Sequence, residues 1–311
     1  MDQGRELIKN FPLQTRSFWE NILKKKSLEE IRIRADKPVI LRVEEEEWFL
    51  DAEGKSIKKK ELAYCMGFRQ IQELVDYWCK DSRYAFQKEL RNGYLTLQGG
   101  HRVGICGEAV TDLHGEIQTI KNISSLNIRI ARECKEAGEE ILPLLYENGV
   151  LHSTLIVSPP GAGKTTLLRD LVRRISDGSE KRSGRVVGLV DERGELAACY
   201  QGIPQLDIGL RTDVIDSSSK ADGMICLLRS MSPQVIAVDE LGSIREIKAL
   251  LRLAGCGCSI MATVHGSSVE EIRKRRMFRR LWEERVFGRI LVLERKEGRY
   301  CHKIYRGGDL A

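Results

Sequence analysis

A glycine-rich segment carries the clearest chemical signal in the chain. It reads Ser158-Pro-Pro-Gly-Ala-Gly-Lys-Thr165 and follows the apolar run Leu155-Ile-Val157. Glycines allow successive backbone N–H groups to face one anion, and a helix that begins beside them adds positive potential. The spacing predicts a phosphate-binding loop, with Ser158 where the pattern usually has its first glycine. An ordinary strand–turn–helix connection is the alternative interpretation.

The side chains of this loop have distinct expected roles. We expect Lys164 to reach the β- and γ-phosphates of ATP, and the Thr165 hydroxyl to bind Mg²⁺. The predicted ATP-binding residues of the loop are Ser158, Pro159, Pro160, Gly161, Ala162, Gly163, Lys164, Thr165 and Thr166.

Two acids end a second apolar run, Val235-Ile-Ala-Val-Asp-Glu240. An acid at the carboxyl end of a parallel strand lies at the edge where such sheets bind ligands. We expect Asp239 to hold Mg²⁺, directly or through water, and Glu240 to orient the attacking water as the catalytic carboxylate. A strand followed by solvated acids is the alternative, but the order of the two motifs favours an ATPase.

The elements that must position these residues differ between the two halves of the chain. Before about residue 132, alternating runs predict strands at 31–34, 38–43, 94–97, 102–109 and 123–130, and apolar spacing predicts a helix over 60–79. Later, the short apolar runs 153–158, 185–191, 234–238 and 259–264 alternate with helical segments such as 166–175, and a hairpin is expected over 289–305. That alternation is typical of a parallel sheet covered on both faces.

The predicted fold class is therefore α/β. We expect a P-loop NTPase domain with a mostly parallel sheet over residues 151–311, preceded by a smaller α+β domain over 1–132. Residues 133–150 are expected to form a linker and a short helix that includes residues 139–142.

Composition limits the class of protein. The 311 residues carry a net charge of +6 and are 42% hydrophobic, which is enough for the cores of two domains. Nine scattered cysteines favour reduced thiols in the cytosol, and Cys256 and Cys258 lack a second ligand pair for a metal site. The first ten residues lack the apolar run of a signal peptide, and no transmembrane segment is expected.

Four motifs in order resemble those of secretion-superfamily ATPases, the motors of type II and type IV secretion. The phosphate loop is the first, Val190-Asp-Glu-Arg-Gly-Glu-Leu196 resembles their acidic box, Ser232–Gly242 their Walker B segment, and Ala262-Thr-Val-His-Gly266 their histidine box. The resemblance implies a RecA-like fold for the P-loop domain. The segments 191–195, 210–213 and 229–236 are similar, more narrowly, to the stage III sporulation protein AA family.

This resemblance implies a function and a setting. It implies Mg-dependent ATP hydrolysis that energises a trans-envelope channel complex during endospore formation, from mother cell to forespore. The expected partners are further copies in a homo-hexamer and the membrane channel subunits, and nucleic acid is not expected. The expected location is the mother-cell cytoplasm, peripheral at the inner face of the membrane.

The resemblance also adds candidate site residues. Glu192 and Glu195 would help position Mg²⁺ or water, and His265 would sense the γ-phosphate, while Arg129 and Arg132 would approach nucleotide phosphates. Each has a plainer alternative: solvated acids at the start of a helix, a loop histidine, and the exposed face of a strand. Which of Asp191 and Glu192 faces the metal stays open.

Two other functions remain open. A nucleic-acid-dependent RecA-like ATPase is suggested by the net charge and by the basic run Arg273-Lys-Arg-Arg276 with Arg279 and Arg280. Such a run is more often a charged helix face, and few aromatic residues lie between its cations for base stacking. A nucleotide-dependent assembly switch would bind ATP tightly with almost no turnover.

Overall fold

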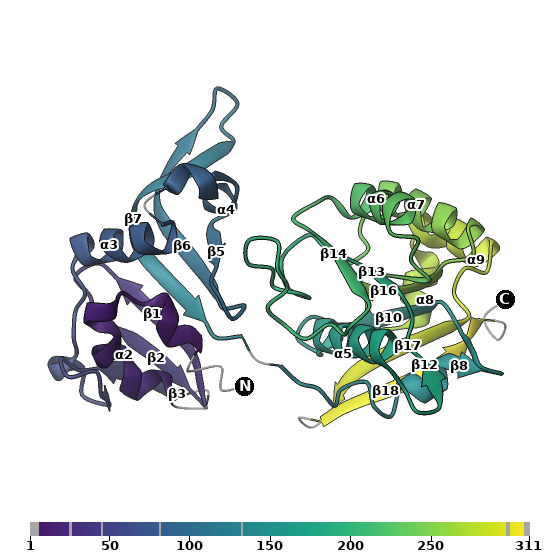
Figure 1. Cartoon of the computed structure of the whole chain (residues 1–311), viewed down its shortest axis with the longest axis horizontal. Helices are drawn as coiled ribbons and strands as arrows, with labels where there is room; N and C mark the ends of the chain where they lie inside the picture. The colour runs from purple at the N-terminus through teal and green to yellow at the C-terminus, as the bar shows by residue number, and fades with distance from the viewer. Residues whose placement is uncertain are drawn as a thin grey trace. The chain divides into compact units, whose positions relative to one another are not determined.

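The computed structural model describes residues 6–24, 27–44, 46–80, 82–131, 133–296 and 299–307. The chain divides into two units, Met1–Arg132 and Glu133–Ala311 (Figure 1). Residues 133–150 therefore belong to the second unit. Among the described residues, no helix combines the length and apolar character that a membrane crossing requires.

The first unit is built on an antiparallel sheet with the strand order β4-β3-β2-β1-β7-β6-β5. In β1, Ile31 and Ile33 are buried while Arg32 and Arg34 are exposed, so the period-two pattern puts one face on the core. The strands are β1 Leu28–Arg34, β2 Ile40–Val43, β3 Glu46–Leu50, β4 Ser56–Ile57, β5 Tyr94–Thr96, β6 Arg102–Thr111 and β7 Ile117–Arg129.

Short helices bury their apolar sides on this sheet. The α-helices are α2 Arg16–Leu23, α3 Phe68–Trp78 and α4 Gln87–Arg91, and the 3₁₀ turns are Ile8–Asn10, Leu13–Thr15, Lys60–Leu62 and Arg83–Phe86. Trp19, Ile71 and Val75 join the core with Leu41 and Ile128 from the strands. The α+β prediction for this unit is confirmed.

The helix predicted over residues 60–79 is shorter in the structure. Ala63 and Cys65 form bridges to Asp51 and Pro38, so this stretch is extended. Helix α3 starts only after Gly67, whose N–H donates to the side chain of Gln70 at 2.9 Å. Pairing with distant residues outweighs the local helical spacing here.

The second unit contains a sheet with the strand order β14-β13-β15-β16-β10-β17-β18. All neighbours in it are parallel except the closing hairpin of β17 and β18. The strands are β10 Thr154–Ser158, β13 Val187–Asp191, β14 Thr212–Asp216, β15 Val235–Val238, β16 Ser259–His265, β17 Arg289–Lys296 and β18 Arg299–Arg306. Two small pairs lie outside it: β8 Tyr146–Glu147 with β9 Val150–Leu151, and β11 Gly178–Ser179 with β12 Arg182–Ser183.

Helices cover both faces of this sheet. They are α5 Lys164–Asp177, α6 Lys220–Ser230, α7 Ile244–Gly255, α8 Val269–Lys274 and α9 Arg279–Glu283, with 3₁₀ turns at Leu142–Leu145 and Arg276–Phe278. Ile156 of β10 packs in the core beneath α5, whereas its neighbour Val157 packs in the core beneath α6 and α7. Strands buried on both faces explain why the sequence shows continuous apolar runs here.

Two expectations for this unit were wrong or incomplete. The short helix expected around residues 139–142 is a 3₁₀ turn, Leu142–Leu145, which contains Pro143 and leads into β8. Strand β14 was not predicted, because every residue of Thr212–Asp216 is only half-buried at the sheet edge and only two of its five residues, Val214 and Ile215, are apolar.

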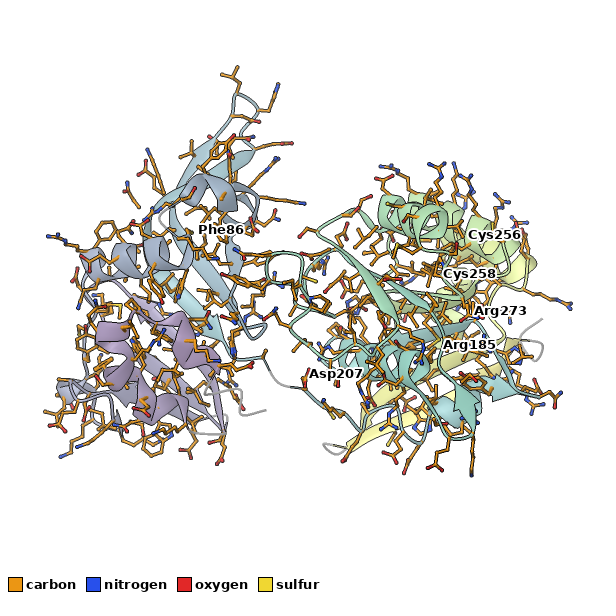
Figure 2. The ribbon with its side chains drawn as sticks, in the orientation of Figure 1. Phe86, Arg185, Asp207, Cys256, Cys258 and Arg273 are labelled. Atoms are coloured by element: carbon orange, nitrogen blue, oxygen red, sulfur yellow. The ribbon has the colours of Figure 1, made fainter. Side chains whose placement is uncertain are left out.

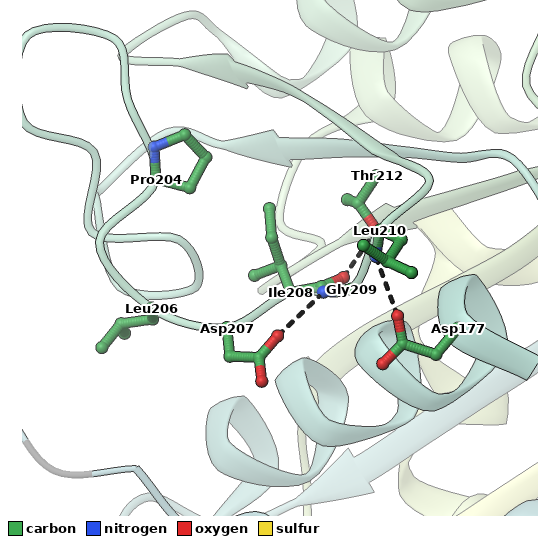
Figure 3. Close-up of a pocket in the computed structure, with 8 residues that line it drawn as sticks. All are labelled: Asp177, Pro204, Leu206, Asp207, Ile208, Gly209, Leu210 and Thr212. Atoms are coloured by element: carbon green, nitrogen blue, oxygen red, sulfur yellow. Dashed lines mark hydrogen bonds between the residues drawn. The ribbon is translucent and has the colours of Figure 1, made fainter. Parts of the chain in front are cut away.

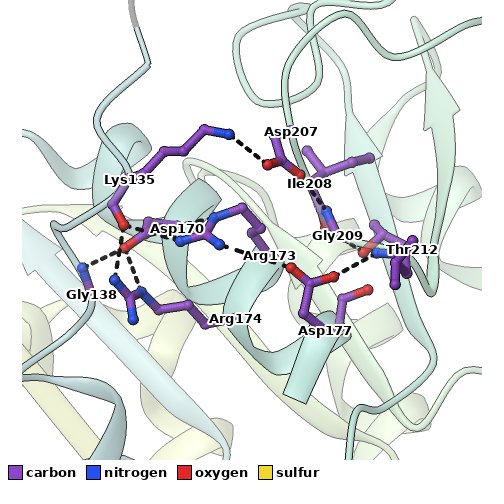
Figure 4. A network of polar contacts seen from close by, with 12 residues as sticks. Lys135, Gly138, Asp170, Arg173, Arg174, Asp177, Asp207, Ile208, Gly209 and Thr212 are labelled. Carbon is purple, nitrogen blue, oxygen red and sulfur yellow. Dashed lines mark hydrogen bonds and ion pairs between the residues drawn. The ribbon is translucent and has the colours of Figure 1, made fainter. Parts of the chain in front are cut away.

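A buried carboxylate ties residues 133–150 to α5 (Figure 4). Asp170 accepts hydrogen bonds from the Gly138 N–H at 2.8 Å and from the guanidinium groups of Arg173 and Arg174 at 2.6 and 2.9 Å. Arg174 also donates to the Lys135 carbonyl at 2.9 Å. These contacts anchor the start of the second unit to the helix that follows the phosphate loop.

Candidate functional site

Three neighbouring strands bring the predicted motifs to one edge of the sheet. Strand β16 lies between β10, which leads into the phosphate loop, and β15, which leads into the acid pair. Ser158 is paired with His265, and Val238 is paired with Ala262. Since parallel strands end at the same edge, the loop, the acids and the histidine lie together there.

The phosphate loop has the backbone that its glycines permit. Gly161 and Gly163 have φ angles of 74° and 82°, in the left-handed region. A Cβ at Gly161 would meet nothing within 4 Å, so the φ angle rather than crowding calls for glycine there. Gly163 is the N-cap of α5, and no side chain caps this helix end. Its first N–H groups therefore suit an anion.

The other loop residues are arranged around this turn. Ser158 is fully buried and its hydroxyl donates to the Pro159 carbonyl at 2.8 Å. Ala162 is buried, Pro160 is exposed, and Thr166 is half-buried in the first turn of α5.

Lys164 is directed at the acid pair. Its Nζ atom lies 2.8 Å from Oε1 of Glu240 and 3.9 Å from Oδ1 of Asp239. Only 10% of the lysine side chain and 18% of the Glu240 side chain are exposed, so solvent screens this ion pair weakly.

A hydroxyl and a carboxylate form the predicted magnesium pair. The Thr165 hydroxyl donates to Oδ2 of Asp239 at 2.8 Å. Both are hard oxygen ligands, and Mg²⁺ is commonly held by one or two protein oxygens together with waters and substrate phosphates. The pair therefore fits magnesium. The described residues contain no cluster of three or more His, Cys, Asp and Glu side chains that would enclose a metal by themselves.

Thr263 is a site residue that the sequence analysis missed. Its hydroxyl donates to Oδ1 of Asp239 and accepts the Glu240 N–H at 2.8 Å. It thereby fixes the side chain of one acid and the backbone of the other. A polar residue inside the fully buried part of an apolar strand was the available signal.

Glu240 is surrounded by hydrogen-bond donors and cations. His265 Nε2 lies 2.6 Å from the same oxygen that Lys164 contacts, and Arg193 lies 2.5 Å from the other oxygen. Burial alone would raise the pKa of Glu240, but Lys164, Arg193 and His265 together lower it to about 2. The carboxylate is therefore ionised at neutral pH. Glu240 also has a φ angle of 55°, which is unusual for a non-glycine residue.

The acidic box contributes both a structural acid and two acids of the site. Asp191 is buried and accepts backbone N–H groups from Glu195, Leu196 and Ala197 at 2.9, 3.0 and 2.7 Å. The Asp191 carboxylate thus fixes the backbone of the loop over residues 195–197. Glu192 and Glu195 line one small cavity, which Asp191, Asp239 and Glu240 also line. Glu192 lies 3.3 Å from Lys220, so Asp191 and Glu192 both have protein partners, and which of them faces a metal stays a prediction.

The two predicted arginines belong to the first unit, and their role stays a prediction. Arg129 is the exposed last residue of β7, paired with Glu30 of β1 and Arg102 of β6. Arg132 lies outside the described residues.

The basic run and the cysteine turn have local explanations. Arg275, Arg279 and Arg280 each form an ion pair with a glutamate four residues away, at 2.6, 2.7 and 2.8 Å. Arg273 is exposed on α8 (Figure 2). Cys258 is buried, which raises its pKa to about 11, whereas Cys256 is exposed.

A larger hollow lies under the long segment between β13 and β14 (Figure 3). Its volume is about 500 Å³, and Asp177, Pro204, Asp207 and Leu210 are among its lining residues. Asp207 accepts the Gly209 N–H at 3.3 Å and Asp177 accepts the Leu210 N–H at 2.8 Å, so both carboxylates hold the loop. None of the predicted site residues lines this hollow.

Comparison with solved structures defines the class of fold. A pilus retraction motor, PilT with bound ADP, superposes over 90% of this chain and 79% of its own, with a TM-score of 0.62 and 15% identity. The ATPase DotB of Yersinia pseudotuberculosis gives 0.58 and 15% identity over 94% of this chain and 79% of its own. The fold is thus that of secretion-type ATPases with an N-terminal domain, and the predicted fold class is confirmed.

The sequence comparisons define the family. The family model for sporulation stage III, protein AA matches residues 2–307. The stage III sporulation protein AA of Bacillus subtilis (strain 168) is 42% identical over 271 residues, which are 87% of this chain and 84% of the relative. The chain belongs to the sporulation stage III protein AA family, as the motifs of residues 191–236 predicted.

Proposed function

We propose that this protein hydrolyses Mg·ATP as a secretion-type ATPase of endospore formation. The observation that carries the proposal is the convergence of Lys164 on Glu240 and of Thr165 on Asp239 at the carboxyl edge of the sheet, at 2.8 Å each. Burial of a lysine and an acid costs free energy, and an ordinary strand–turn–helix connection does not require these buried charges.

The phosphate loop would hold the nucleotide. The backbone N–H groups around Gly161 and Gly163 would face the phosphates, and Lys164 would exchange its carboxylate partner for phosphate oxygens. Thr165 and Asp239 would hold Mg²⁺, which supplies positive charge against the charge that develops on the transferred phosphoryl group. The hydrogen bond from the Thr263 hydroxyl would keep Asp239 turned toward Thr165.

Glu240 would orient the attacking water. With a pKa of about 2 it stays a carboxylate and accepts hydrogen bonds, but it is a weak base while Lys164 is bound to it. Departure of Lys164 to the nucleotide would raise the pKa of Glu240 and leave His265 as the remaining partner of Oε1. His265 contacts that oxygen and lies beside the loop, which suits it to respond to the terminal phosphate.

The setting follows from the family and from the resemblance of the motifs. We propose that the protein assembles as a homo-hexamer and energises a trans-envelope channel complex between mother cell and forespore. It would act in the mother-cell cytoplasm, peripheral at the inner face of the membrane, in contact with the channel subunits. Arg129 and Arg132 would then reach phosphates from the same or a neighbouring copy.

A nucleotide-dependent switch is a second candidate, and one observation favours it. Lys164, Arg193 and His265 all contact Glu240, so the acid is fully engaged in the arrangement described. Such a site would turn over slowly until a partner releases Glu240. A nucleic-acid-dependent ATPase receives less support, because the cations Arg275, Arg279 and Arg280 already have glutamate partners.

The test is ATP hydrolysis measured against protein concentration for the wild type, Lys164→Ala and Lys248→Ala. Lys248 is an exposed residue of α7 and serves as the matched control. Specific activity that rises with concentration, depends on Lys164 and ignores Lys248 supports the motor. Tight ATP binding with negligible turnover at every concentration supports the switch. Absence of both binding and turnover contradicts the proposal.

A further inference from the structure

A buried lysine contacts the backbone of the acid pair, and neither the motifs nor the proposed mechanism uses it. Lys220 is only 8% exposed and is the first residue of α6. Burial disfavours its charge, and the positive end of the helix dipole disfavours a cation at this position. Residues that break two local rules at once commonly serve a site.

Three contacts compensate the charge of Lys220, and each comes from a different segment. Its Nζ atom donates to the Glu240 carbonyl at 2.6 Å, lies 3.3 Å from Oε2 of Glu192 and lies 3.8 Å from Oε1 of Glu246. It therefore joins the acidic box, the end of β15 and the start of α7.

The backbone of Glu240 needs such support. Its left-handed conformation is disfavoured for a residue with a side chain and persists only where the surroundings fix it. On one side, Thr263 accepts the N–H groups of Glu240 and Leu241 at 2.8 and 2.9 Å. On the other side, the Lys220 ammonium group donates a hydrogen bond to the Glu240 carbonyl.

Glu246 continues the same support toward α7. Its second oxygen accepts the N–H groups of Gly242 and Ser243 at 2.7 and 3.2 Å, and the Ser243 hydroxyl accepts the Glu246 N–H at 3.3 Å. Lys220 thus holds both the Glu240 carbonyl and the acid that caps the next turn. Lys220 therefore contacts the segment from Glu240 to Ser243 at its first residue and, through Glu246, supports its end.

We propose that Lys220 is a positioning residue of the ATPase site. Its ammonium group holds the backbone of Glu240 so that the carboxylate points at Lys164 and His265, and it keeps Glu192 turned toward the same cavity. The catalytic consequence rests on the proposed ATP hydrolysis, whereas the effect on the backbone does not.

The experiment compares Lys220→Met, Lys220→Gln and the exposed control Lys248→Met in the full chain. Amide hydrogen exchange over residues 239–243 reports the backbone, without any need for turnover. We expect Lys220→Met to accelerate exchange there by about tenfold or more, with the core of α5 unchanged. Lys220→Gln keeps an N–H donor for the Glu240 carbonyl and should restore part of the protection, and Lys248→Met should match the wild type.

Kinetics provide the second readout. We expect Lys220→Met to lower kcat by about tenfold to a hundredfold while the ATP KM and the affinity for a fluorescent ADP analogue stay within about threefold. Unchanged exchange over residues 239–243 in Lys220→Met overturns the proposal, whatever the turnover. A wild type without turnover counts against the proposed function alone, since the exchange comparison still stands. Failure of both Lys220 variants to fold, with Lys248→Met folded, assigns Lys220 a structural role and also overturns the proposal.

Discussion

The Lys164 ammonium and the Glu240 carboxylate lie 2.8 Å apart although 76 positions separate them in the sequence. Lys164 is the first residue of α5, which follows β10 and the phosphate loop. Glu240 follows β15, which is separated from β10 in the sheet by β16. The lysine that we expect to bind phosphate is thus paired with the carboxylate that we expect to orient water. Because of this ion pair, we expect a change at Glu240 to affect nucleotide binding and turnover differently.

Replacement of Glu240 by glutamine should separate binding from turnover. The amide keeps the shape of the side chain but cannot accept the water proton or pair as an anion with Lys164. We expect ATP turnover to fall by about a hundredfold or more, while a fluorescent ATP analogue binds at least as tightly as to the wild type. Single-turnover phosphate release and a binding titration measure the two effects. Unchanged turnover would instead favour the assembly switch.

Replacement of Thr263 by valine should weaken both the fold and the magnesium pair. The change leaves the Glu240 N–H without its acceptor and Asp239 without its donor. We expect a loss of about 1–3 kcal/mol in the free energy of unfolding. Urea denaturation measures it, and a magnesium titration of turnover should shift to higher concentration. Thr263→Ser keeps the hydroxyl and is the control; equal losses in both variants would contradict the bridging role.

Replacement of Asp191 by alanine should destabilise the acidic box. Three backbone N–H groups, two of them in buried hydrogen bonds, lose their acceptor. We expect the free energy of unfolding to fall by about 2–4 kcal/mol, and Asp191→Asn, which keeps one acceptor oxygen, to fall in between. Thermal unfolding at fixed pH measures the series. A full loss of turnover with no change in stability would show instead that Asp191 acts directly in catalysis.

The low pKa of Glu240 predicts a dependence of stability on pH. The folded protein lowers this pKa from 4.5 to about 2, so the ion pairs stabilise the fold above the unfolded value and lose that contribution as the pH falls toward 2. We therefore expect the wild type to lose unfolding free energy between about pH 5 and pH 2 more steeply than Glu240→Gln. Urea denaturation across this range measures the slopes. Glu140→Gln removes an exposed carboxylate and should follow the wild type.

Much of the ATPase unit could be predicted because its signals are local. The buried strands β10, β13, β15 and β16 produce continuous apolar runs, and each predicted motif sits at the end of one of them. The phosphate loop is written in consecutive residues, so its glycines and Lys164 could be identified without a structure. The sheet geometry then brought the acid pair and His265 to the same edge, as expected.

The missed residues depend on contacts that no local pattern encodes. Lys220 lies in a polar stretch and gains meaning only from Glu192 and Glu246, which other segments supply. In the sequence, Arg193 cannot be told from other surface arginines, and only the structure shows its ion pair with Glu240. Strand β14 is a half-buried edge, where weak burial leaves a weak pattern.

The position of β16 between β10 and β15 has a consequence for how the site tolerates change. Thr263 and His265 are two residues apart and so share one face of the strand, whereas Ala262 and Val264 pack into the core on the other face. An insertion or deletion of one residue in β16 before Ala262 would exchange the two faces, so that Thr263 and His265 would move to the side of α6 and α7, and Ala262 and Val264 would move to the side of α5. Thr263 and His265 would therefore lose their contacts with the acid pair together, so the spacing between them matters to the site as much as either side chain does.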